Sequence, residues 1–205
     1  SSYSVKLDRY NTQARLTALS KSGFHEYTFP ESNDSKIIID LGSFLQSHEK
    51  QMLVGSEVRI LSDTEVEGYS RIRGGWNEGG PYTVYFYARF DTPAKETGTW
   101  KSNRLYPGKL SQTDTNEKTG AYFTYQTVKG QKVCAQVGIS FMGTNKAKAN
   151  LEEMKSWNFE EVRNTAVNQW NEILSKVQLT GSEENKKIFY TAMYHSFLQP
   201  VNRTG

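Results

Sequence analysis

The sequence predicts a mainly β fold, in which an antiparallel β-sandwich is followed by two or three α-helices. From Ser1 to Phe141 apolar and polar residues alternate in short stretches, and Gly, Pro, Asn or Asp interrupts them every eight to fifteen residues or so. Such spacing is typical of the strands of a sandwich. After Gly143 apolar residues recur instead at three- and four-residue steps, which is the period of helices.

Composition and charge narrow the class of protein. A chain of 205 residues can bury a sizeable core, and a single cysteine, Cys134, excludes an internal disulfide framework. The net charge of +3 comes from basic and acidic residues interspersed along the chain, so no nucleic-acid partner is expected. No apolar run reaches 18 residues, so we also expect no membrane span.

We expect strands along the whole of the first two thirds of the chain. Their predicted positions are 3–9, 13–20, 24–29, 36–41, 52–61, 66–72, 82–90, 121–126 and 132–141. Because the alternation is already present at Tyr3, the sequence predicts that the chain begins in mid-fold.

Two of these strands allow predictions for single side chains. In the strand at 82–90 the core face is expected to consist of Tyr82, Val84, Phe86, Ala88 and Phe90. In the strand at 132–141 the odd positions are apolar and the even positions small or polar, which predicts burial on one side. Gly138 in this strand should let another backbone or ring approach closely.

Three helical segments are expected after residue 143. The first, at 146–157, is predicted to cap an end of the sandwich. Asn158 is a candidate N-cap, with Glu161 reaching back to its amide, for a helix that ends at Thr180-Gly181. The apolar stripe of that helix is Val162, Ala166, Trp170, Ile173 or Leu174, and Val177. Ser182 should cap the next helix.

The last helix, from Glu183 to about Leu198, is apolar on more than one side. One neighbouring helix covers only a stripe, so we expect contact with protein outside this chain and exposure of some large side chains without it. The residues concerned are Phe189, Tyr190, Met193, Tyr194 and Phe197. His195, on an apolar face, is expected to be a hydrogen-bonded core residue.

Catalytic and metal-binding patterns are weak in this sequence. Glu65 and Glu67 could have the separation that glycoside hydrolysis requires, but a solvated strand face is the favoured interpretation. The histidines His25, His48 and His195 are widely spaced and lack partners at metal-ligand intervals, so a transition-metal site is not expected.

Aromatic residues offer better candidates for binding. Trp76, Asn77 and Glu78 lie in a glycine-dense loop and would suit a sugar ring, although the favoured interpretation of Trp76 is a cap on the sandwich core. Tyr85, Tyr87 and Arg89 form a second possible platform. For these three, the favoured interpretation is a sheet face covered by other elements.

Several segments together resemble a known family. They are Gly23-Phe24-His25-Glu26-Tyr27-Thr28-Phe29-Pro30, Ile37 to Leu41, Gly74-Gly75-Trp76, Tyr85-Phe86-Tyr87-Ala88, Ala149-Asn150-Leu151, the helix with Trp170 and the helix with Tyr194-His195. In this order they resemble glycoside hydrolase family 92, the bacterial exo-acting α-mannosidases. The resemblance implies a sandwich domain of the galactose-mutarotase-like or supersandwich type at 1–143, with its N-terminal part missing. It also implies linker helices at 144–205 that lead to an (α/α)6-barrel catalytic domain beyond this chain.

The resemblance also implies an activity for the parent protein. Family 92 enzymes are calcium-dependent, inverting exo-α-mannosidases that act on N-glycans or mannans in the periplasm or at the cell surface. Their acid, base and calcium ligands belong to the barrel, so no catalytic or metal residue is carried over to this chain. The expected partners are a mannose-containing glycan and the parent's own C-terminal catalytic domain. After Pro200 the sequence departs from the family pattern, which leaves linkage preference open.

Two other classes of function stay open. The chain could be a non-catalytic carbohydrate-binding sandwich, which the loop containing Trp76 would favour. Alternatively, it could be a structural interaction domain whose exposed helices dock a partner.

Overall fold

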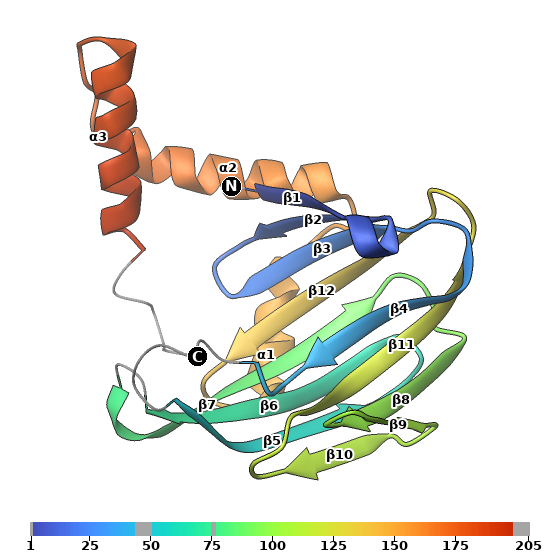
Figure 1. Ribbon diagram of the computed structural model, residues 1–205. Coiled ribbons are helices and arrows are strands. Elements are labelled where there is room, and N and C mark those ends of the chain that lie inside the picture. Colours follow the sequence, from blue (N-terminus) through green and yellow to red (C-terminus); the bar gives the residue numbers. More distant parts are fainter. Residues whose placement is uncertain (1, 44–50, 75–76, 199–205) are drawn as a thin grey trace.

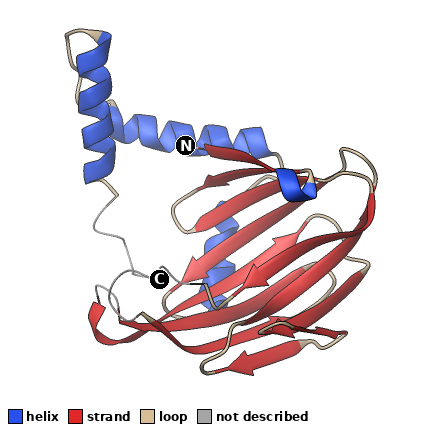
Figure 2. Ribbon diagram, viewed as in Figure 1, coloured by secondary structure: helices blue, strands red, loops and turns tan. Residues whose placement is uncertain are grey.

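The computed structural model describes residues 2–43, 51–74 and 77–198 (Figure 1). Over these residues the chain forms two antiparallel sheets followed by helices, which Figure 2 shows in red and blue. The strands are β1 (Ser2–Leu7), β2 (Thr12–Ala18), β3 (Ser22–Thr28), β4 (Ser32–Asp40), β5 (Met52–Ile60), β6 (Glu65–Gly74), β7 (Asn77–Phe90), β8 (Glu96–Lys101), β9 (Arg104–Pro107), β10 (Ser111–Asp114), β11 (Thr119–Thr127) and β12 (Lys132–Ser140).

The two sheets differ in size. The large sheet has eight strands in the order β1-β2-β3-β12-β7-β6-β5-β10, and the small sheet has four in the order β4-β11-β8-β9. Every strand predicted from the sequence is present, and the predicted mainly β fold is confirmed. Strands β8, β9 and β10 were not predicted, because their segments are short and lack apolar alternation.

The main core lies between the two sheets. From β7 the predicted face contributes Phe86, Ala88 and Phe90, and the Phe90 ring lies 4.6 Å from that of Phe123 in β11. The buried hydroxyl pair Ser56 and Thr119 joins the two sheets at 2.8 Å, and a second buried pair, Ser35 and Thr127, joins β4 to β11 within the small sheet at 2.8 Å. Each hydroxyl therefore has a partner and avoids the free-energy cost of unpaired burial.

Helices cover part of the outer face of the large sheet. Helix α1 (Thr144–Asn150) and the 3-10 turn η2 (Leu151–Glu153) pack on β12 and β7, and α2 (Phe159–Leu174) packs on β2 and β3. The prediction that this first helix caps an end of the sandwich is therefore wrong, because it lies across a face. For the same reason β12 is not buried on one side only: residues 133–136 are all buried. Burial among these elements raises the pKa of the Cys134 thiol to about 12.

Gly138 permits the close approach of α1, as its position in a strand predicted. A Cβ atom at Gly138 would lie 2.2 Å from the carbonyl oxygen of Ala147 and 3.1 Å from the Leu151 side chain. The backbone of α1 therefore occupies the space that any other residue would need.

Arg15 anchors the first turn of α2 to the large sheet. Its guanidinium lies 3.9 Å from the centre of the Phe159 ring and donates to Glu26 Oε1 at 3.1 Å, while its other nitrogen pairs with Glu160. Glu26 is 6% exposed and also accepts from Lys132 Nζ at 3.1 Å. A buried carboxylate on the sheet is thus neutralised by a cation that also holds the first turn of the helix.

The caps of α2 and α3 (Glu183–Ser196) follow the predicted residues. The Asn158 side chain accepts from the amides of Glu160 and Glu161, as expected of an N-cap. The Glu161 carboxylate, however, accepts from the Ser156 hydroxyl at 2.6 Å instead of reaching back to the Asn158 amide. Ser182 caps α3 through the amide of Asn185.

Helix α2 is shorter than predicted and only its first half is buried. It ends at Leu174, so Val177 lies beyond it. Val162 and Ala166 are buried against the sheet, whereas Trp170 is half-buried and lies against the ring of Tyr194 in α3, 4.5 Å away. The predicted stripe is therefore divided between the sandwich and the next helix.

Helix α3 stands apart from the sandwich in Figure 1 and buries none of its residues. Ile188 is 63% exposed and Phe197 51%, which agrees with the expected exposure of this helix. His195 is exposed as well, so its predicted place in a core is wrong. No helix in the described part of the chain is both long and apolar enough to span a bilayer.

We predict that Gly138→Ala lowers the free energy of unfolding by about 2 kcal/mol or more, because α1 or β12 must shift to admit the methyl group. Urea unfolding followed by circular dichroism measures this change. Gly23→Ala in the neighbouring β3 is the control: its new Cβ would meet only the His25 ring, at 3.6 Å, so its effect should stay within about 0.5 kcal/mol. Equal effects of the two changes would contradict the close-packing argument.

For Arg15→Ala we expect a loss of about 2 kcal/mol, because the buried Glu26 loses one of its two cations and Phe159 loses its stacked guanidinium. Arg163, which also pairs with Glu160 but lies on the surface, is the matched control. Its replacement by alanine should cost less than about 0.5 kcal/mol. If both variants unfold at the same urea concentration, Arg15 does not anchor α2.

Candidate functional site

The sugar-binding residues predicted from the sequence lie at the hairpin between β6 and β7. Trp76 lies outside the described residues. Asn77 and Glu78 begin β7, but their side chains also lie outside the described part. The strands that carry the hairpin are described up to Gly74, which pairs with Asn77 and has a φ of 82°. The assignment of a sugar to these three residues stays a prediction.

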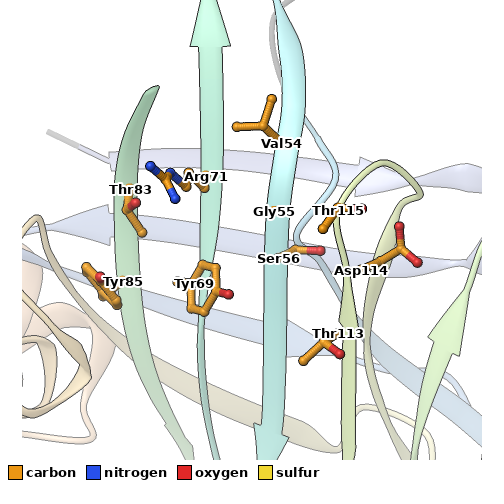
Figure 3. Close-up of a pocket in the computed structure, with 10 residues that line it drawn as sticks. All are labelled: Val54, Gly55, Ser56, Tyr69, Arg71, Thr83, Tyr85, Thr113, Asp114 and Thr115. Atoms are coloured by element: carbon orange, nitrogen blue, oxygen red, sulfur yellow. The ribbon is translucent and has the colours of Figure 1, made fainter. Parts of the chain in front are cut away.

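A groove of about 430 Å³ lies on the outer face of β5, β6 and β7 (Figure 3). The side chains arise from strand alternation: in β6 and β7, Tyr69 is opposite Tyr85, and Arg71 is opposite Thr83. The edge strand β10 and the turn after it form one wall. The lining residues are Val54, Gly55, Ser56, Tyr69, Arg71, Thr83, Tyr85, Thr113, Asp114 and Thr115.

Two tyrosines and a glycine shape the groove. The rings of Tyr69 and Tyr85 are half-buried, 5.8 Å apart and inclined by 58°. Gly55 forms part of the floor: a Cβ there would point toward the Arg71 Cβ at 3.7 Å and a ring carbon of Tyr69 at 3.9 Å. The register shift between Leu53 and Gly55 in β5 brings this glycine to the groove.

Asp114 ties the edge strand β10 to the small sheet. Its carboxylate pairs with Lys101 Nζ at 2.5 Å and accepts from the amides of Asn116 and Glu117 at 2.8 and 2.7 Å. The hydrogen bond from Lys101, followed by those from the two amides, holds the pKa of Asp114 well below its usual range. The Asp114 charge is therefore neutralised by Lys101 of the small sheet, and β10 contributes its backbone and Thr113 to the groove wall, opposite Arg71.

Helix α1 covers only part of the second predicted platform, which consists of Tyr85, Tyr87 and Arg89. Tyr87 is 2% exposed, with Lys148 Nζ 4.7 Å from its ring centre, and burial followed by a hydrogen bond with Glu65 raises its pKa. Arg89 donates to Gln136 at 2.8 Å and lies over Trp157. The favoured interpretation, a covered sheet face, is thus confirmed for Tyr87 and Arg89, whereas Tyr85 faces the groove.

The acidic pair on β6 is engaged in structural contacts. Glu67 accepts from Arg59 at 2.5 Å and its side chain is 13% exposed, while Glu65 interacts with Tyr87 and Lys148. The two carboxylates are therefore half-buried and partnered, and the interpretation as a solvated face is only partly right. Within residues 2–43, 51–74 and 77–198 no group of three or more acidic, histidine or cysteine side chains could hold a metal ion.

Most of the residues that line the groove were not predicted from the sequence as binding residues. Tyr69 and Arg71 share a face by simple alternation in 66–72, which was a usable signal. Asp114 and the threonines beside it could not be placed, because β10 was not predicted.

Comparison with known proteins accounts for nearly the whole chain. The pattern described as the glycosyl hydrolase family 92 N-terminal domain matches residues 1–140, and that of the family 92 catalytic domain matches residues 146–205. A comparison with curated proteins gave no match.

Solved structures resemble the chain over nearly its full length. The family GH92 α-mannosidase BT3965 from Bacteroides thetaiotaomicron has a TM-score of 0.86 at 28% identity, over 97% of this chain and 27% of that one. The GH92 family glycosyl hydrolase ccman5 has a TM-score of 0.79 at 26% identity, over 94% of this chain and 25% of that one. The inverting mannosidase BT2199 from the same Bacteroides species, at 24% identity and a TM-score of 0.81 over 97% of this chain and 26% of that one, shares the fold.

This chain therefore spans about a quarter of the length of the structures it matches. The two matched patterns meet between residues 140 and 146, where the strands end and α1 begins. With the first pattern alone extending over 140 of the 205 residues, the chain belongs to glycoside hydrolase family 92.

Proposed function

We propose that the parent of this chain is a calcium-dependent, inverting exo-α-mannosidase that acts on the α-mannosides of N-glycans or mannans. The observation that carries the proposal is the similarity to the α-mannosidase BT3965, which extends through the sandwich and the helices at 28% identity. A structure of that protein in complex with mannoimidazole matches this chain equally closely, with a TM-score of 0.85, and supports a mannose-type ligand.

The chemistry of such an enzyme needs two carboxyl groups on either side of the sugar, about 6.5–9.5 Å apart for inversion. The acidic pair of β6 does not offer them, because Glu65 and Glu67 are held by Tyr87, Lys148 and Arg59. We therefore assign the acid, the base and the calcium ligands to the part of the catalytic domain that this chain does not contain. The described residues hold no group of three or more acidic, histidine or cysteine side chains that would fit a calcium ion.

The role of this chain in the enzyme is to support the catalytic domain and to orient it on the sandwich. Residues 146–205 match the family 92 catalytic domain, and α2 is the first long helix in that segment. Because Arg15, Glu26 and Phe159 fix the first turn of α2 on the large sheet, they set the direction in which the catalytic domain leaves the sandwich.

The proposed location of the parent protein rests on its family membership alone. We place the parent in the periplasm or at the cell surface, where long mannose-containing glycans are accessible. The runner-up functions, a non-catalytic carbohydrate-binding sandwich or a structural interaction domain, predict a parent without glycosidase activity.

We expect the full-length parent to release mannose from an aryl α-mannoside and to lose that activity when a chelator removes calcium. Proton NMR of the first product should show β-mannose, because inversion at the anomeric carbon converts the α-linkage. Recovery of activity on adding calcium back is the control for chelator damage. Absence of turnover, or α-mannose as first product, would contradict the proposal.

The 205-residue chain alone should not hydrolyse the same substrate, because its acidic pair is bound in structural contacts. Glu67→Gln should leave the background rate unchanged and, by weakening the ion pair with Arg59, alter only stability. Turnover that persists through purification and disappears in Glu67→Gln would show that this chain carries a catalytic carboxylate.

A further inference from the structure

We propose that the groove on β5, β6 and β7 is a second, non-catalytic binding site for a neutral hexopyranose of a glycan chain. The choice of α-mannose as the sugar rests on the proposed function of the parent. The site itself rests on the geometry of the groove.

The volume and shape of the groove suit one or two sugar rings. Ligand sites in proteins measure about 300–1,000 Å³, and this groove measures about 430 Å³. Its floor is low at Gly55, where the absent side chain exposes the edges of Tyr69 and Arg71. A pyranose ring has an apolar face of C–H groups that can lie on a tyrosine, and Tyr69 and Tyr85 offer two such surfaces side by side.

The polar groups of the groove favour a hydroxylated ligand. Figure 3 shows the Arg71 guanidinium on β6, whereas the Asp114 carboxylate on β10 points away from β5 and is taken up by Lys101 of the small sheet and by the amides of Asn116 and Glu117. The hydroxyl groups of a sugar can accept from the Arg71 guanidinium. The threonine hydroxyls at 83, 113 and 115 add groups that both donate and accept.

Protein docking fits this face less well than a sugar. None of the side chains that line the groove belongs to the large apolar residues that the described part of the chain exposes; those lie elsewhere, at positions such as Tyr3, Ile188 and Phe197. Protein interfaces have an apolar centre with buried anchors. A polar groove with two half-buried tyrosines matches the smaller footprint of a glycan.

The test is affinity electrophoresis of the 205-residue chain in native gels that contain a soluble α-mannan. We expect the mannan to retard the chain, and Gly55→Val, which fills the floor, to weaken binding at least about tenfold, or about 1.4 kcal/mol. The nearest atom to a Cβ at position 55 lies 3.7 Å away from it, so the strand can carry a side chain there without a clash. Arg71→Gln and Tyr85→Ala should weaken binding in the same way.

Matched controls come from the small sheet. Tyr106→Ala and Arg104→Gln alter a half-buried tyrosine and an exposed arginine of β9, outside the groove, and should bind mannan as the wild type does. Thermal unfolding of every variant identifies those that are folded. Because Arg71→Gln replaces an exposed side chain, it keeps the test informative if Tyr85→Ala unfolds.

Three results would overturn the proposal. They are the absence of retardation of the folded wild-type chain, equal retardation of the folded groove variants, and retardation by anionic polygalacturonate but not by mannan. In the parent, protection of Tyr85 from hydroxyl-radical footprinting without sugar would assign the groove to domain docking instead. Hydrolysis by the parent is measured separately, so failure of the mannosidase proposal is distinguishable from failure of this one.

Discussion

The close contact between Gly138 and the carbonyl group of Ala147 determines how the outer face of the large sheet is used. The eight-stranded sheet has one face toward the small sheet, and its other face would be open to water without further cover. Because β12 has no side chain at Gly138, α1 can lie directly on the strand and bury Tyr87 and Cys134. The second core of the molecule is built around this contact.

The helices cover only part of this outer face. α1 and α2 lie over β2, β3, β12 and β7, and α1 reaches the start of β6 near Glu65, but Tyr69 and Arg71 further along β6 line the groove beside β5. One part of the face therefore holds the helices that begin the match to the catalytic domain, while another part holds the groove with Tyr69 and Arg71. Strand β7 belongs to both parts: Tyr87 lies under α1 and Tyr85 lines the groove.

The sequence was informative where the local pattern decides the structure. Alternation located nine strands, and the side chains of Asn158 and Ser182 cap the helices as predicted, because capping depends on neighbouring residues alone. The covered face of β12 could not be read locally, since its even positions, such as Gln136, are buried by a helix that follows it in the chain.

In the candidate site, too, local sequence patterns identified some residues, while others depended on contacts between distant segments. Tyr85 was recognised as one of a possible platform, but its partner across the strands, Tyr69, became apparent only from the register of β6 and β7. Asp114 belongs to an edge strand of four residues whose polar sequence resembles a loop. The positions of these residues depend on pairing between strands that are far apart in the sequence, which composition and periodicity do not reveal.

The way in which α2 is held has a consequence for enzyme engineering. Its contacts with the sandwich begin at Phe159 and end at Ala166, the last buried residue of the helix, and beyond it Trp170 turns to α3. A chimaera that exchanges catalytic domains between family members should therefore be joined after Ala166, so that each sandwich retains its own match between Arg15 and the helix. A junction at residue 143, where the strands give way to helices, would separate surfaces that have to fit one another.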